Sequence, residues 1–153
     1  MAAHSLCPCP ATRGFSDGVQ WKDRRFADGH TLEVLHHQHP ERIRLSSIDR
    51  PEKGQAYGQQ AKQAASALVF GKEVVFQTHG KDKYKRTLAD VVLPDGSNVN
   101  HALVKDGWCW WYRKYAPADA VLEELEKAAR SAKRGLWADP HPVSPWVWRM
   151  QSH

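Results

Sequence analysis

The residues of this chain that could do chemistry are two arginines, Arg44 and Arg86, and two carboxylates that follow the first of them, Asp49 and Glu52. A guanidinium group offers paired N–H donors to phosphate or carboxylate oxygens. A carboxylate can orient a water molecule or bind a hard cation. Taken singly, each of the four is best explained as a solvated side chain or a surface ion pair. Their grouping in two short charged segments favours a shared site.

The length and charge of the chain narrow the class of protein. At 153 residues the chain is long enough for one domain with a hydrophobic core and too short for two ordinary domains with a linker. The formal net charge is +5 and the pI about 9.2, with lysines and arginines spread along the whole length. A basic surface of this kind suits polyphosphate partners, although many basic proteins bind none.

The cysteines and the apolar segments indicate the compartment. Three cysteines, Cys7, Cys9 and Cys109, are an odd number that does not suit a disulfide framework, and they do not make up a four-ligand zinc site. No apolar run is long enough for a signal-peptide core or a membrane span. The sequence as written therefore predicts a cytoplasmic monomer with no membrane partner, and a mis-assigned start would hide an export signal.

The hydrophobic pattern predicts an arm, one domain and a short tail. Residues 1–18 lack periodicity and predict a disordered arm, 19–148 a folded domain, and 149–153 a tail. Alternating segments within the domain predict five short strands, the first three as an antiparallel meander: Trp21–Phe26, Thr31–Leu35, Arg42–Ile48, Lys72–Gln77 and Thr87–Leu93.

Three segments with helical spacing lie between and after these strands. They are Gly54–Phe70, a short helix capped by Asn98 or Asn100 that ends at Gly107, and Pro117–Arg134. The segment Pro140–Trp148, at the end of the expected domain, is a tail rich in proline and tryptophan. Five short strands with about three helices predict an α+β protein built on a partly open, five-stranded OB-fold barrel.

Two segments of the chain resemble the signatures of the staphylococcal-type thermonuclease family. Residues 44–52 read Arg-Leu-Ser-Ser-Ile-Asp-Arg-Pro-Glu and are similar to the family's arginine strand followed by hydrophobic-Asp-x-Pro-Glu. Residues 82–86 read Asp-Lys-Tyr-Lys-Arg and are similar to its Asp-Lys-Tyr-Gly-Arg. Segments 28–31, 99–107 and 134–138 add to a resemblance that covers roughly residues 19 to 148.

The resemblance implies an OB-type barrel and calcium-dependent endonuclease hydrolysis of DNA and RNA with little sequence preference. It implies that Arg44 and Arg86 stabilise the charge that develops on the phosphate oxygens, and that Glu52 orients the attacking water. It implies further that Asp49 shares the calcium ion with the main-chain carbonyl of Arg50.

The same resemblance implies a substrate-binding set outside the charged cluster. Lys83 and Tyr84 match positions that hold the terminal phosphate in the family. Tyr112 and Tyr115 lie near family tyrosines that face the cleft, where aromatic rings can stack on bases. The neighbouring tryptophans, Trp110 and Trp111, are better explained as core residues.

Three positions depart from the family pattern and indicate a weakened or metal-altered site. His30 stands where the family has its second metal-binding aspartate, and calcium prefers oxygen ligands, so a zinc or manganese ion would tolerate the change better. Arg50 places a cation beside the expected metal. Lys85 replaces a glycine, at a cost of about 1 kcal/mol if that turn has a positive φ, and such strain would re-aim Arg86.

Two functions from different classes remain open at this point. One is a metal-dependent nuclease acting on DNA and RNA, with Ca²⁺ or another divalent ion as cofactor. The other is a binding module that keeps the barrel and its basic cleft but has lost cleavage. Retention of Arg44, Glu52 and Arg86 together favours the nuclease, because drift after loss of activity would spare none of them in particular.

Overall fold

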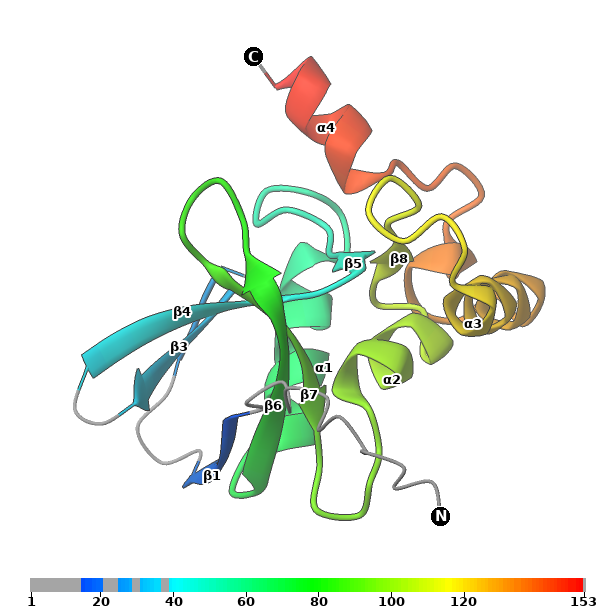
Figure 1. Cartoon of the computed structure of the whole chain (residues 1–153). Helices are drawn as coiled ribbons and strands as arrows, with labels where there is room; N and C mark the ends of the chain where they lie inside the picture. The colour runs from blue at the N-terminus through cyan, green and yellow to red at the C-terminus, as the bar shows by residue number, and fades with distance from the viewer. Residues whose placement is uncertain (1–14, 21–24, 29–30, 37–38, 153) are drawn as a thin grey trace, which may run out of the picture.

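The computed structural model describes residues 15–20, 25–28, 31–36 and 39–152. A curved sheet forms one side of the molecule and a group of helices the other (Figure 1). Six strands pair in the order β1-β6-β7-β4-β3-β2: β1 (Phe15–Gln20), β2 (Arg25–Asp28), β3 (Thr31–His36), β4 (His39–Leu45), β6 (Glu73–Lys81) and β7 (Thr87–Val92). Two further strands, β5 (Ile48–Asp49) and β8 (Trp110–Trp111), pair with each other. This confirms the predicted α+β, OB-type fold. The main sheet has six strands among the described residues where five were expected, because β1 begins at Phe15, inside the segment expected to be an arm.

The meander expected from the alternation is present as β2, β3 and β4, which pair antiparallel in chain order. The expected first strand was Trp21–Phe26, of which residues 21–24 lie outside the described residues, and β2 is Arg25–Asp28. Strand β4 then pairs with β7 in parallel, with Arg44 opposite Leu88. This pairing joins the meander to the β6–β7 hairpin, and the local pattern of hydrophobic residues contains no signal for it. Its consequence is that Arg44 and the residues just before β7 lie close together.

Helices α1 (Gly58–Val69), α2 (Val99–Lys105) and α3 (Ala120–Ser131) lie within the three segments predicted as helical. The carboxamide of Asn98 accepts a hydrogen bond from His101 N at 3.1 Å, so Asn98 is the N-cap of α2. Two helical segments were not expected: the 3₁₀ turn Gly135–Ala138 and α4 (Pro145–Gln151), which begins inside the predicted tail. Ser144 followed by Pro145 is a helix-start signal, since proline suits the first turn.

The main core lies between the sheet and the helices. Alternate residues of β7 are buried, as expected for a strand with one face on the core. The buried apolar residues of β3, β4, β6 and β7 pack with those of α1 and α2, including Leu32, Ile43, Phe76, Ala65 and Leu103. Trp110 and Trp111 are also buried, as the sequence predicted.

One buried polar side chain, Asn100, connects α2 to the strands. Its Oδ1 accepts from Val91 N at 3.2 Å, and its Nδ2 donates to Ser46 O at 3.1 Å. Buried amides are costly unless they are bonded in this way. Asn100 therefore holds the end of β4 against β7 and α2, close to the strand β5 that carries Asp49.

Within the described part of the chain, no helix is both long enough and apolar enough to cross a membrane.

The end of α2 packs tightly against the end of α3 through Gly107. Gly107 has φ 79°, and a Cβ there would lie 2.2 Å from the carbonyl oxygen of Arg134. Leu136 N donates to Gly107 O at 2.9 Å. This close backbone approach determines where the chain enters β8, the partner of β5.

We predict that Gly107→Ala lowers the free energy of unfolding by about 3 kcal/mol or more, because a clash with backbone is added to the strain of a positive φ. Gly96→Ala is the matched control: its φ is 87°, but a Cβ there meets nothing within 4 Å. Gly96→Ala should lower the free energy of unfolding only by the cost of a positive φ, about 1 kcal/mol. Urea unfolding of both variants measures the difference, and equal losses of stability would contradict the close contact.

Candidate active site

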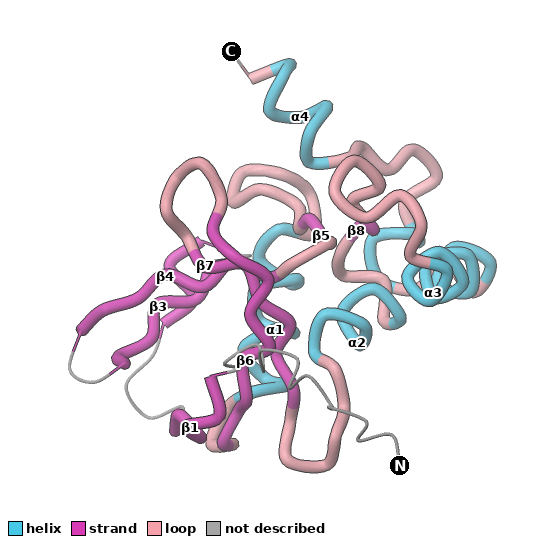
Figure 2. The backbone as a smooth tube through the Cα atoms, viewed as in Figure 1, coloured by secondary structure: helices cyan, strands magenta, loops and turns pink. Residues whose placement is uncertain are grey.

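The sequence-predicted site residues that the structure describes gather at one end of the molecule. The loop after β5, the loop between β6 and β7 and the loop after β8 lie at this end, with α4 above them (Figure 1). Figure 2 shows that the backbone here is mostly loop, between the sheet and α4. Loops at one end of a rigid barrel are a common place for a binding or catalytic site.

Arg44 lies at the centre of this end. It sits on β4 opposite Thr31 of β3, and the residue is only 8% exposed. Its Nη2 lies 3.8 Å from Asp49 Oδ1, whereas its Nη1 is buried with no hydrogen-bond partner in the described part of the chain. Burial lowers the pKa of Arg44; the carboxylate of Asp49 opposes this effect, and the neighbouring cations Arg86 and Arg149 add to it. The Arg44 guanidinium therefore has a donor available and lies in a cluster of positive charge.

Arg86 is held in place by Asp82. Its Nε donates to Asp82 Oδ2 at 2.8 Å and its Nη2 lies 2.7 Å from the same oxygen, while Nη1 contacts Thr31 Oγ1 at 3.3 Å. Thr31 thus lies between the two arginines. Sequence analysis gave Asp82 no role, although its position four residues before Arg86 in one turn is a signal for this pair.

Lys85 has φ 63°, so the turn before Arg86 does require the positive φ that the glycine of the family pattern would supply. Asp82 Oδ1 nevertheless accepts from the backbone N–H groups of Tyr84 and Arg86, at 2.9 and 3.0 Å. These bonds keep the turn closed around Arg86 despite the strain at Lys85.

Asp49 is fully buried at the end of β5. Its Oδ1 accepts from the backbone N–H of Arg50 at 3.1 Å. The guanidinium of Arg50 contacts the start of α1, where its Nη1 donates to Gly58 O at 3.0 Å. Arg50, whose charge was expected to oppose a metal ion at Asp49, is therefore hydrogen-bonded to the backbone of α1.

Both carboxylates make short contacts with Arg149, a residue of α4 that lies in the segment expected to be a tail. Arg149 Nη2 lies 2.7 Å from Asp49 Oδ2, and Nη1 lies 2.6 Å from Glu52 Oε1. Burial by itself lowers the pKa of Arg149, but the bonds to Asp49 and Glu52 outweigh it and raise the pKa above its ordinary value. The guanidinium bridges the two carboxylates.

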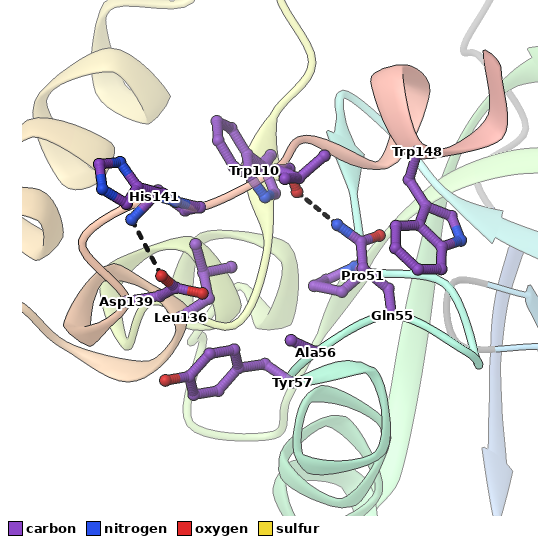
Figure 3. A pocket seen from close by; sticks show the side chains of 11 residues that line it. Pro51, Gln55, Ala56, Tyr57, Trp110, Leu136, Asp139, His141 and Trp148 are labelled. Carbon is purple, nitrogen blue, oxygen red and sulfur yellow. Dashed lines mark hydrogen bonds between the residues drawn. The ribbon is translucent and has the colours of Figure 1, made fainter. Parts of the chain in front are cut away.

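Gln55 connects the loop that carries Glu52 to the segment before α4. Its Oε1 accepts from Glu52 N at 3.1 Å, and its Nε2 donates to the carbonyl of Val143. Figure 3 shows Gln55 pointing from the loop after Pro51 toward the C-terminal segment, beside Trp148. A small cavity of about 80 Å³ lies here, lined by residues that include Tyr57, Trp110 and Trp148.

The four residues expected to bind substrate lie on two different loops. Tyr84 is exposed on the β6–β7 loop, with Lys83 Nζ 5.0 Å and Arg86 Cζ 5.2 Å from its ring centroid. Tyr112 and Tyr115 follow β8 and meet edge to face, with centroids 4.7 Å apart. Tyr84 thus lies beside Arg86, whereas Tyr112 lies beside α4, where its ring stacks on Trp146 at 5.1 Å.

The fit of a metal ion can be judged from the carboxylates that are present. Calcium takes six to eight oxygen ligands. In the part of the chain that the structure describes, no group of three or more His, Cys, Asp or Glu side chains could hold an ion. Asp49 and Glu52 are bridged by a guanidinium, and His30 lies outside the described residues. As arranged here, these residues do not fit a calcium ion.

Comparison with known proteins places the chain among nucleases. The family model described as staphylococcal nuclease homologue matches residues 42–139. An uncharacterized endonuclease of Escherichia coli O157:H7 is 46% identical over 125 residues, which are 82% of this chain and 81% of the relative. A micrococcal nuclease of Shigella flexneri is 42% identical, over 84% of this chain and 79% of the relative.

We predict that Arg86→Gln raises the pKa of the Asp82 carboxyl toward its ordinary value. Burial raises that pKa, but the backbone and side-chain hydrogen bonds of Arg86 outweigh it, so the pKa lies below 3.8. When folding lowers the pKa of a carboxyl group, the ionised group stabilises the folded state at every pH above its ordinary pKa. This stabilisation is lost as the pH falls through the lowered pKa of the folded state.

Carbon-13 NMR of the carboxyl groups, titrated downward from neutral pH, measures this change. Asp95 is the internal control, because its pKa is lowered mainly by Ser97 in a separate turn and should be the same in both proteins. An unchanged Asp82 titration in the variant would show that the guanidinium does not hold this carboxylate.

Proposed function

The chain belongs to the staphylococcal nuclease homologue family, and from that premise we propose that it hydrolyses phosphodiester bonds of DNA and RNA with little sequence preference. Relatives named as endonuclease and micrococcal nuclease, 42–46% identical over most of their length, support this proposal. The site described above has the groups that such a reaction needs.

The observation that carries the proposal is that Arg44 and Arg86 both lie next to Thr31 and are near enough for their charges to act on each other, while a buried donor of Arg44 is left unbonded among the described residues. A buried N–H without an acceptor is costly, and the cost falls when a ligand supplies one. The acceptor that suits two adjacent guanidinium groups is an oxyanion with several oxygens, and a phosphodiester is one.

The chemistry follows from this arrangement. Attack of water on a phosphodiester increases the negative charge on its non-bridging oxygens, and Arg44 and Arg86 donate hydrogen bonds to them. Asp82 fixes the direction of the Arg86 guanidinium before substrate binds. Glu52 orients the attacking water or accepts its proton. The Glu52 side chain is 31% exposed, which supports its access to water.

The exposed residues beside this centre suit a nucleic-acid strand. Lys83 and Tyr84 extend from the β6–β7 loop next to Arg86, where a cation and an aromatic ring can bind a phosphate and a base. Tyr115 is exposed on the loop after β8. We assign to these three residues the binding of nucleotides next to the bond that is cleaved.

The resemblance also implies a calcium ion, which would polarise the phosphate as a Lewis acid. Because Asp49 and Glu52 are bridged by Arg149, no step of the hydrolysis is assigned to a metal ion. The same bridge favours the alternative function, a nucleic-acid-binding module without cleavage, since a Glu52 bonded to Arg149 is less free to orient water. A cleavage assay distinguishes the two.

We predict that Arg44→Ala, Arg86→Ala and Glu52→Gln each lower the cleavage rate by about 100-fold or more, since each removes a transition-state contact worth about 3 kcal/mol. Arg42→Ala is the matched control: Arg42 lies two residues before Arg44 on β4 and pairs with Glu33 at the surface. Thermal unfolding of each variant shows that the fold is kept. Cleavage by all three variants at the parental rate would reject the site.

We also predict that affinity for single-stranded DNA falls steeply with salt, because each phosphate neutralised by an arginine or lysine releases a counterion. Fluorescence anisotropy of a labelled oligonucleotide in EDTA, between about 50 and 200 mM salt, gives the slope of log K against log salt. Arg44→Ala should reduce that slope by about 0.7. A flat salt dependence would reject a binding mode based on phosphate contacts.

A further inference from the structure

The contact of Arg149 with the two carboxylates is not part of the predicted chemistry. It joins residues that are 100 and 97 positions apart in the chain, and it is made by the last helix. Both Nη atoms are used, one for each carboxylate, at 2.7 and 2.6 Å. The guanidinium is therefore placed where both Asp49 and Glu52 can be neutralised at once.

The need for a cation at this point is strong because Asp49 is completely buried. A buried carboxylate is very unfavourable without positive charge and hydrogen bonds. Arg44 is more distant, at 3.8 Å from Asp49, while Arg149 makes the short contacts. A divalent cation bound by the same two carboxylates would satisfy the same electrostatic need, since carboxylate oxygens are its preferred ligands.

Besides Arg149, the α4 segment is held at its start, where Ser144 and Pro145 are buried, and by one aromatic side chain, Trp146. Trp146 stacks on Tyr112 and meets Trp110 edge to face, at 5.1 and 5.6 Å. A cavity of about 80 Å³ lies beside Trp148, so the packing under this segment is incomplete (Figure 3). Met150 is 78% exposed. Helix α4 stands at the edge of the molecule in Figure 1 and can leave without opening the barrel core.

We propose that the guanidinium of Arg149 takes the place of a divalent cation between Asp49 and Glu52, so that docked α4 and a bound metal ion exclude each other. Helix α4 is then a built-in inhibitor of these carboxylates, and a metal ion can bind them only after Arg149 has moved away. The inference rests on the proposed function in one respect: while α4 is docked, Glu52 is bonded to Arg149 and cannot orient the attacking water of the proposed hydrolysis.

The test is a calcium titration by calorimetry without nucleic acid, on the parent chain, Arg149→Gln and Arg113→Gln. Arg113 is the matched control because it is an exposed arginine on the loop after β8 that contacts Glu126 and Trp111 and makes no ion pair with Asp49 or Glu52. We expect Arg149→Gln to bind calcium at least 10-fold more tightly than the parent, and Arg113→Gln to match the parent.

A second variant should release α4 from the two carboxylates without a change at Arg149. Trp146→Ala removes the ring contacts of α4 and should also tighten calcium binding, although by less. Hydrogen exchange of residues 144–152, followed by mass spectrometry, should become faster in this variant. In the parent, saturating calcium should cause the same increase, because the ion displaces the helix.

Equal calcium affinity in all four proteins would overturn the inference. A loss of single-stranded DNA affinity in Arg149→Gln, with calcium affinity unchanged, would also overturn it and assign Arg149 to the nucleic acid. The titration needs no cleavage, so it is independent of the proposed function. If Arg149→Gln binds calcium more tightly but no variant cleaves nucleic acid, the inference stands and the nuclease function is rejected. If the parent chain cleaves nucleic acid but all four proteins bind calcium equally, the nuclease function stands and the inference is rejected.

Discussion

The arrangement of this end of the molecule depends on one buried charge, the carboxylate of Asp49. A carboxylate with no solvent exposure must be neutralised from within the protein. Here the backbone N–H of Arg50, the guanidinium of Arg44 and the guanidinium of Arg149 all lie against it. Arg44 therefore has two parts in this arrangement: it helps to neutralise the buried Asp49, and it is one of the two arginines, with Arg86, that we propose to bind a phosphodiester.

The barrel and the helices together determine the position of Asp49 at the end of β5. Strand β5 is only two residues long, and its partner β8 is equally short, so neither is positioned by its own pairing alone. Asn100 holds the end of β4 against α2 and β7, and Gly107 determines where α2 turns toward β8. The segments 99–107 and 134–138, which supported the family resemblance, meet at this glycine through the Leu136–Gly107 hydrogen bond. Their resemblance to the family therefore has a structural reason.

The turn before Arg86 shows how local hydrogen bonds can hold a strained backbone conformation. Lys85 is held at positive φ, and Asp82 uses both carboxylate oxygens to keep the turn closed and the Arg86 guanidinium directed toward Thr31. The hydrogen bonds of Asp82 to the turn and to the Arg86 side chain offset the cost of the non-glycine residue at this position. The effect of lysine in place of glycine at position 85 is thus confined to the turn of residues 82–86.

The sequence by itself determined the residue types of the candidate site, the antiparallel meander, the helices α1, α2 and α3 and the OB-type fold, because alternation, capping and turn residues act over a few neighbouring positions. The Asp82–Arg86 pair was also within its reach, since both partners lie in one turn. The parallel pairing of β4 with β7 and the bridge from Arg149 to Asp49 were decided only by the tertiary structure. Residues 100 positions apart leave no periodic signal, and which distant cation neutralises a buried carboxylate depends on the path of the chain between them.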